Sequence, residues 1–187
     1  MTGRFALHTA VLAALLLLQV AGALHGINEA VNSSLPLVDN ASIRVLTELG
    51  GDAFLVAFTV LVLLLDWKNG GKISKKTLAF LVATFVGLAV VGVLKVATAE
   101  PRPRPLPGAN ALSAGAFPSG HTFRAAVIAS YVADRWKRLS YIAWAYAVGI
   151  ALTRLLLHYH WLSDVAFSLL LAPWLYHVAK ELVGVEE

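Results

Sequence analysis

Cysteine is absent from this chain of 187 residues. Its absence excludes disulfide bridges, thiolate metal sites and a cysteine nucleophile. Charged residues are also scarce, at 14% of the chain, against about a quarter in an average soluble domain. Hydrophobic residues make up 58% and the mean hydropathy is +0.72, so a membrane protein is indicated. The net charge of +4 fits cytoplasmic loops and an anionic substrate better than a nucleic-acid partner.

Long apolar runs are what the sequence has in abundance. A helix needs about 20 mainly apolar residues to span a bilayer. The second of six such stretches is short, and we expect it to begin earlier, near Ala41. The sequence therefore predicts an all-α bundle of six transmembrane helices, forming a single domain over residues 1–187, with these spans: Phe5–Leu24, Gly51–Trp67, Thr77–Thr98, Ser119–Trp136, Leu139–Leu157 and Leu162–Leu182.

The first of these spans has features of a cleavable signal peptide. Arg4 precedes the apolar run, and the small residues of Ala21-Gly22-Ala23 follow it. However, the apolar region of a signal peptide has about 7–15 residues, and this run is longer. We therefore predict a retained helix.

Basic residues are distributed unequally between the two ends of the predicted spans. The end that carries the termini has nine: Arg4, Lys68, Lys72, Lys75, Lys76, Arg135, Lys137, Arg138 and Lys180. The other end has six, of which five lie in or beside polar motifs: Arg44, Lys95, Arg102, Arg104, Arg124 and Arg154. The positive-inside rule then places both termini in the cytoplasm and the polar motifs on the extracytoplasmic side of a cell membrane.

Three polar segments fall on that second side: "KVATAEPRPRP", "FPSGHTFR" and "TRLLLHYHWLSD". Together they contain three cations, Lys95, Arg102 and Arg154. Charges inside the bilayer cost about 2.5–3.5 kcal/mol each on insertion scales, so we expect them to converge at the outer interface. The planar guanidinium of arginine can bind two phosphate oxygens at once, which indicates an anionic substrate. Taken singly, each has an alternative: Lys95 can snorkel at a helix end, and Arg154 can form a structural salt bridge with Asp164.

The second and third segments add the groups that a phosphoryl transfer requires. Ser119 and Gly120 open a helix, where free backbone N–H groups favour an anion. His160 and Asp164 are four residues apart, so the carboxylate can orient the imidazole as a nucleophile. His121 lies beside this anion site and can give a proton to a departing oxygen. The acids near the site are Glu100 and Asp164 alone, so we predict chemistry without a metal or another cofactor.

The order and spacing of these residues resemble the three signature motifs of the type 2 phosphatidic acid phosphatase (PAP2) superfamily: Lys95-x6-Arg102-Pro103, Pro118-Ser119-Gly120-His121 and Arg154-x5-His160-x3-Asp164. The resemblance covers about residues 50–171. It implies a metal-independent membrane phosphatase that forms a phosphohistidine. In that family pattern, His160 attacks phosphorus and Asp164 orients the imidazole of His160. His121 protonates the leaving group, and the remaining matched positions bind the phosphoryl oxygens: Lys95, Arg102, Ser119, Gly120 and Arg154.

A few positions depart from the family pattern or compete with it. Thr153 stands where the family usually has serine, and Arg104 offers a second "RP" pair. His158 competes with His160 as the nucleophile, but Leu162, not an acid, follows it by four residues. Arg124 either adds charge to the site or faces the headgroups, and the sequence leaves this open.

We therefore expect a lipid phosphatase that releases inorganic phosphate at the outer membrane face. Its partners are the lipid substrate and the surrounding membrane lipids, and its oligomeric state is not indicated. The first-choice substrate is a prenyl pyrophosphate of the undecaprenyl or dolichyl type, with phosphatidylglycerol phosphate or phosphatidic acid next. The alternatives from other classes are a lipid phosphotransferase and a non-catalytic binder or flippase of anionic lipids.

Overall fold

The computed structural model describes residues 3–106, 108 and 114–185. All of the regular secondary structure in this part of the chain is helical, as predicted. The helices in chain order are α1 (Gly3–Val20), α2 (His25–Ser34), α3 (Ala41–Glu48), α4 (Asp52–Gly70), α5 (Lys75–Thr98), α7 (Gly120–Arg135), the single 3-10 turn η1 (Lys137–Leu139), α8 (Ser140–Leu156) and α9 (Leu162–Val183).

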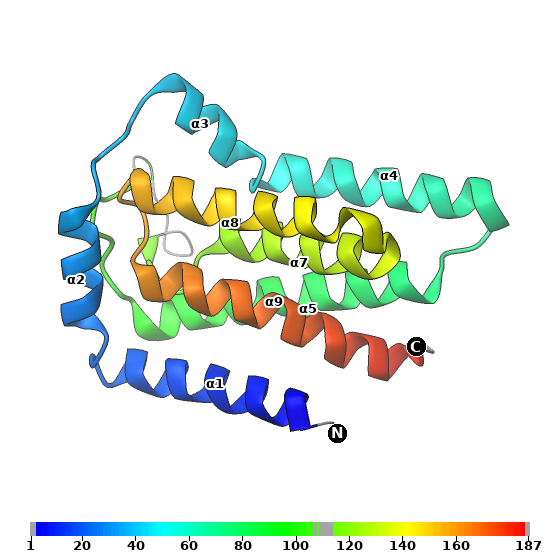
Figure 1. The fold of residues 1–187 in the computed structure, drawn as a ribbon, viewed down its shortest axis with the longest axis horizontal. Helices are drawn as coiled ribbons and strands as arrows, with labels where there is room; N and C mark the ends of the chain where they lie inside the picture. Colours follow the sequence, from blue (N-terminus) through cyan, green and yellow to red (C-terminus); the bar gives the residue numbers. More distant parts are fainter. Residues whose placement is uncertain (1–2, 107, 109–113, 186–187) are drawn as a thin grey trace.

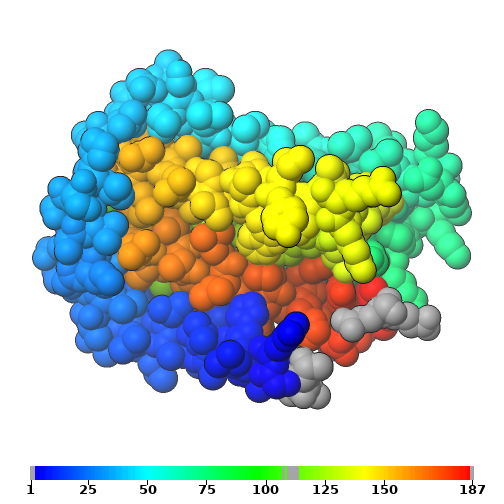
Figure 2. Space-filling view, viewed as in Figure 1, coloured from blue at the N-terminus to red at the C-terminus, as the bar shows by residue number. Residues whose placement is uncertain are grey.

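Six helices (α1, α4, α5, α7, α8 and α9) run lengthwise and alternate in direction, so both termini lie at one end of the bundle (Figure 1). Lys75 Nζ donates to the carbonyl of Gly184 at 2.9 Å, which ties the start of α5 to the C-terminal end of the chain. The shorter α2 crosses the opposite end (Figure 1), and the space-filling view shows it covering that end together with the segment that follows (Figure 2). The paired termini agree with an even number of membrane crossings.

Five helices within the described residues are long and apolar enough to span a membrane: α1, α4, α5, α8 (with η1) and α9. The sixth predicted span, α7, has only 16 residues. It is packed among α5, α8 and α9, and most of its side chains from Thr122 to Tyr131 are buried. A helix enclosed by other helices does not need a lipid-facing surface, which explains why α7 is shorter and less apolar than its neighbours.

The expectation that the second span begins near Ala41 is wrong. α3 (Ala41–Glu48) is a separate helix, and α4 begins only at Asp52. The break lies at Gly50, where an added Cβ would be 2.6 Å from Ile150 Cγ2 and 3.0 Å from the carbonyl oxygen of His121. Only a glycine fits this close approach, so the chain passes tightly over α8 and the start of α7 before α4 begins.

A second glycine sets the distance between α5 and α7. A Cβ at Gly87 would lie 1.9 Å from Cζ of Phe123, whose ring is fully buried. The ring therefore packs directly on the α5 backbone. Gly92, five residues further along the same helix, has nothing within 4 Å of an added Cβ.

The end of the bundle near the termini is held by paired charges. Arg135, at the end of α7, lies 2.6 Å from the buried carboxylate of Asp66 on α4. Its neighbour Asp134 contacts Lys76 on α5 at 3.1 Å and Lys180 on α9 at 3.3 Å. These ion pairs join α4, α5, α7 and α9 at this end, and each of the three cations contacts a carboxylate.

Candidate active site

The three polar motifs meet at the end of the bundle opposite the termini. Lys95 lies in the last turn of α5 and Arg102 in the segment that follows it. Ser119 caps α7, Arg154 lies in the last turn of α8, and Asp164 lies in the first turn of α9. Each residue is therefore placed by a helix end, where side chains from different helices can converge without breaking the apolar middle of the bundle.

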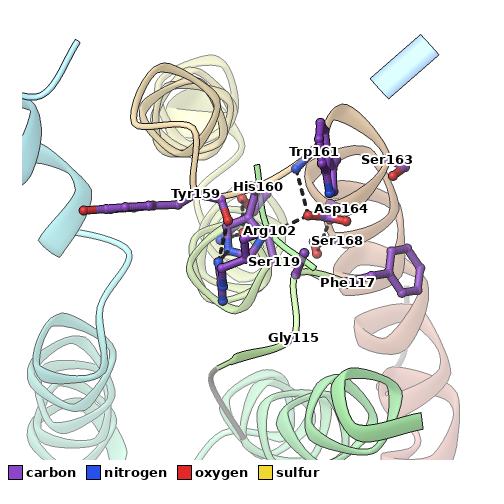
Figure 3. A network of polar contacts seen from close by, with 12 residues as sticks. Arg102, Gly115, Phe117, Ser119, Tyr159, His160, Trp161, Ser163, Asp164 and Ser168 are labelled. Atoms are coloured by element: carbon purple, nitrogen blue, oxygen red, sulfur yellow. Dashed lines mark hydrogen bonds and ion pairs between the residues drawn. The ribbon is translucent and has the colours of Figure 1, made fainter. Parts of the chain in front are cut away.

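His160 lies at the centre of this group, in the turn between α8 and α9. Its Nδ1 is 3.1 Å from Oδ2 of Asp164, and Arg102 Nη1 is 2.9 Å from its Nε2 (Figure 3). A guanidinium can only donate, so Nε2 is the unprotonated nitrogen. Nδ1 then carries the proton and donates it to Asp164. Both neighbours fix the same tautomer, and this tautomer has its lone pair on Nε2.

Burial keeps this imidazole neutral. His160 is 2% exposed, and burial lowers its pKa well below the ordinary value of 6.5, with Arg102, Arg154 and Lys95 lowering it further. Arg102 is half-buried, and the same loss of solvent lowers the pKa of its guanidinium to about 10, so it stays charged at neutral pH. The site therefore presents a neutral nucleophile among cations.

Lys95 and Arg154 are buried cations whose contacts are neutral groups. Lys95 Nζ donates to the carbonyls of Gly115 at 2.6 Å and Ala116 at 3.3 Å. Arg154 is 3% exposed and donates to Thr47 Oγ1 at 3.1 Å, while its Nε has no acceptor within the described residues. The structure therefore differs from both alternatives considered in the sequence analysis: Lys95 does not snorkel, and Arg154 does not form a salt bridge with Asp164. Buried positive charge of this kind is stabilised by a bound anion.

The start of α7 faces the same group. The first helical bond runs from Phe123 N to the Ser119 carbonyl, so the N–H groups of Gly120 and His121 precede it and are free of that ladder. Ser119 is fully buried, and its N–H donates to the Asp164 carbonyl at 3.2 Å, which joins α7 to α9. Its hydroxyl accepts from Thr122 Oγ1 at 3.0 Å, which leaves its own proton for another acceptor.

His121 is partly exposed, and its imidazole has no hydrogen-bond partner among the residues that the structure describes. Positive charge surrounds this imidazole, from four side chains: Arg154, Arg124, Arg102 and Lys95.

Arg124, whose role the sequence left open, forms an ion pair of 2.5 Å with Asp52 at the start of α4 and a longer contact of 3.5 Å with the Gly50 carbonyl. It is thus neutralised by Asp52 while it borders the site.

The two other positions left open are also placed. His158 Nε2 contacts the carbonyl of Leu35 at 3.2 Å, so it is His160, not His158, that meets Asp164. Arg104 forms a 2.8 Å ion pair with Asp39 and lies over the ring of Tyr159. Both residues fasten the α2–α3 connection to the turn that carries His160.

Sequence reasoning missed several residues on α2 and α3 that support the site. Thr47 on α3 accepts from both Thr153 and Arg154 at 3.1 Å. Asn28 on α2 is 2% exposed and exchanges hydrogen bonds with the backbone and hydroxyl of Ser163, at the start of α9. Neither Thr47 nor Asn28 belongs to the three polar motifs, and no pattern in the sequence indicates which residues they contact.

Comparison with known proteins agrees with this geometry. The model of the PAP2 superfamily matches residues 76–183. The chain belongs to the PAP2 superfamily. It also has the fold of a solved structure described as the first transmembrane PAP2-type phosphatidylglycerolphosphate phosphatase from Bacillus subtilis, with a TM-score of 0.74 and 24% sequence identity over 94% of this chain and 97% of that one.

As a PAP2 protein with five helices, among the described residues, that can span a bilayer, the chain is a membrane phosphatase, that is, a phosphoric ester hydrolase. The predicted family, all-helical fold and membrane location are confirmed. The family match includes the residues of all three motifs. The individual roles of these residues, the lipid substrate and the side of the membrane are taken up as proposals below.

Proposed function

We propose that this PAP2 protein removes a phosphate group from a membrane lipid through a phosphohistidine at His160. The observation that carries the proposal is the fixed tautomer of His160. Asp164 and Arg102 together leave the lone pair on Nε2, in a buried group of cations that a phosphoryl group can join. A nucleophile that is neutral, oriented and surrounded by positive charge is suited to attack on an anionic phosphate.

The reaction has two steps. In the first, the bound phosphate anion offsets the surrounding cations, so that His121 can carry a proton. Nε2 of His160 then forms a bond to phosphorus as the bond from phosphorus to the leaving oxygen breaks, and His121 gives that oxygen its proton. The phosphoryl group replaces Arg102 as the neighbour of Nε2, and Arg102 then binds a phosphoryl oxygen. In the second step His121 takes a proton from water, the water oxygen bonds to phosphorus, and inorganic phosphate leaves His160.

The charge that develops on the phosphoryl oxygens is met by side chains and by the start of α7. Lys95, Arg102 and Arg154 supply three positive charges, and Arg154 Nε is buried without an acceptor among the described residues. Ser119 and Gly120 add a hydroxyl and a backbone N–H. Because these groups provide the stabilisation that Mg²⁺ supplies in other phosphoryl-transfer enzymes, we propose that catalysis needs no metal.

A groove beside the site suits a lipid tail. Between α1 and α5 lies a hollow of about 850 Å³, lined by apolar residues such as Leu16 and Leu94 and reaching Glu100 next to the site. Of the candidate lipids, we place phosphatidylglycerol phosphate first, since the solved relative with this fold carries that activity. The prenyl pyrophosphate that the sequence analysis favours comes second, and phosphatidic acid third.

The location follows from the distribution of basic residues. We propose that the protein resides in the plasma membrane with its termini in the cytoplasm and the site on the extracytoplasmic side. The termini and the basic turn between α4 and α5 share one end of the bundle, and the site lies at the other. An outward site acts on lipids of the outer leaflet.

The test is phosphate release by the detergent-purified protein from a panel of phosphatidylglycerol phosphate, a C55 prenyl pyrophosphate and phosphatidic acid, each with and without EDTA. His160→Asn and His158→Asn form a matched pair. We expect release that survives EDTA, a loss of at least about 1000-fold in His160→Asn, and less than about threefold change in His158→Asn. Asparagine tolerates the left-handed backbone at His158, where φ is 54°.

Each result has a direct meaning. Relative rates across the panel name the substrate. Full activity in His160→Asn would overturn the phosphohistidine, and loss of activity with EDTA would overturn metal independence. If labelled phosphate moves from the donor to a lipid hydroxyl without release, the protein is a phosphotransferase; binding of all three lipids without turnover would instead make it a binder or flippase.

A further inference from the structure

Glu100 is a half-buried acid beside the site that the proposed reaction does not use. It follows α5 in the segment that leads to Arg102, and its carbonyl accepts from Ala116 N at 2.8 Å. Its side chain is in hydrogen-bonding contact with Gln19 on α1 and with Asp164 on α9. Glu100 is therefore the neighbour of the residue that orients His160.

The two carboxyl groups have a proton to share. Asp164 is fully buried, and its Oδ2 accepts from His160 and from the backbone N–H of Trp161 at 2.8 Å. Its Oδ1 is buried with no donor from the described residues, and so is Oε2 of Glu100. Two ionised carboxylates in contact repel each other, and a buried acceptor without a donor is costly. A single proton shared by the two carboxyl groups removes both the repulsion and the cost of the buried acceptors that lack a donor.

The geometry points to Glu100 as a positioning residue that stays protonated and donates a hydrogen bond to Asp164. Asp164 is the ionised partner because it already accepts two N–H groups, which favour its charged form. Glu100 lies at the wall of the groove between α1 and α5, and its Oε2 has no donor among the described residues. The relay then runs from Glu100 to Asp164 to His160, and Glu100 acts only through the other two residues.

The ionisation of Glu100 should make the relay sensitive to rising pH. Burial raises the pKa of Glu100, while the contact with Gln19 and the nearby charges of His25 and Lys95 lower it in part. A raised pKa means that the protonated form is favoured in the folded protein. The hydrogen bond to Asp164 is therefore fully present below the ordinary pKa of a glutamate and is lost as the pH rises through the raised pKa.

The experiment compares Glu100→Gln with Glu100→Ala, and it rests on the proposed role of His160. A glutamine amide can accept from Gln19 and still donate to Asp164, but it cannot ionise. We expect Glu100→Gln to keep kcat within about threefold and to shift the loss of activity with rising pH to higher pH. We expect Glu100→Ala to lower kcat by about 10–100-fold with KM nearly unchanged, as for other residues that orient a reactive group.

Two controls keep the outcome interpretable. Glu29→Gln makes the same substitution at an exposed position on α2, paired with His25 at 3.2 Å, and should leave kcat and the pH profile unchanged. Inhibition by inorganic vanadate reports whether the anion site is intact in each variant. Glu100→Gln as inactive as Glu100→Ala, or Glu100→Ala as active as wild type, would overturn the proposal. Activity in His160→Asn would instead overturn the proposed function, so the two failures are distinguishable.

Discussion

The two ends of α7 both gather charged residues, but they do so differently. At its C-terminal end Arg135, Lys76 and Lys180 each lie against a carboxylate, Asp66 or Asp134. At its N-terminal end the buried cations contact neutral groups. Lys95 donates to backbone carbonyls, and Arg154 donates to a threonine hydroxyl and lies over the ring of Tyr159.

The difference separates a structural cluster from a binding site. A cation paired with a carboxylate holds helices together, and its charge is already compensated. A buried cation held by carbonyls and hydroxyls is oriented but not neutralised, so it retains the capacity to bind an anion. On this comparison, substitutions at the C-terminal end of α7 should affect stability, and substitutions at the site should affect catalysis.

The largest expected effect comes from neutralising one cation at each end. Arg154→Gln should lower kcat/KM by at least about 100-fold, as for the removal of other groups that stabilise transition-state charge, while the unfolding midpoint in detergent stays the same or rises. Steady-state kinetics and thermal unfolding of the same preparation measure both quantities.

The matched variant at the C-terminal end of α7 is Arg135→Gln. It leaves the buried carboxylate of Asp66 without its cation, so we expect a loss of about 3 kcal/mol of stability and nearly full specific activity in the folded fraction. If both variants lose stability and keep activity, or both do the opposite, the distinction between the two ends is wrong.

A smaller effect is expected midway between the two ends. Gly87→Ala places a methyl group on the ring of Phe123, two residues beyond His121. We expect a cost of about 1–3 kcal/mol from overpacking, with a moderate fall in kcat as the start of α7 shifts. Gly92→Ala, where an added Cβ meets nothing within 4 Å, should leave stability and activity unchanged. Equal effects of the two substitutions on the unfolding midpoint would contradict this packing.

The smallest effect is expected in the segment between α2 and α3, where Asp39 pairs with Arg44 and Arg104. Hydrogen bonds from these arginines lower the pKa of Asp39 to about 2. The pairs are thus complete above the ordinary carboxylate pKa and are lost as the pH falls through the lowered value. Asp39→Asn should reduce activity by less than about threefold, equally at every pH from about 5 to 8. A pH-dependent loss within that range would show that another group titrates there.

The sequence predicts the parts of this molecule that depend on periodic apolarity and motif spacing. Five of the six predicted spans meet the length and apolarity requirement among the described residues, and the interval of four residues between His160 and Asp164 gives their contact directly. The exception, α7, is shorter and less apolar because other helices surround it in place of lipid.

The contacts that the sequence did not predict depend on how separate helices meet. That α3 is distinct from α4 follows from the approach of Gly50 to Ile150 and His121, which no local pattern contains. Likewise, Gly87 and Gly92 look equivalent in the sequence, and only the position of the Phe123 ring distinguishes them. The pairing of Glu100 with Asp164 brings together residues that belong to different motifs.

The most direct test of the account is detection of the covalent intermediate. The protein would be mixed with phosphatidylglycerol phosphate labelled with ³²P in its terminal phosphate, quenched within the first turnover, and digested for peptide mapping. We predict label on the peptide containing His160, stable in base and released in acid, as expected of a phosphorus–nitrogen bond, and absent from His160→Asn. Phosphate release from this lipid without any label at His160, or label on another residue, would contradict the account.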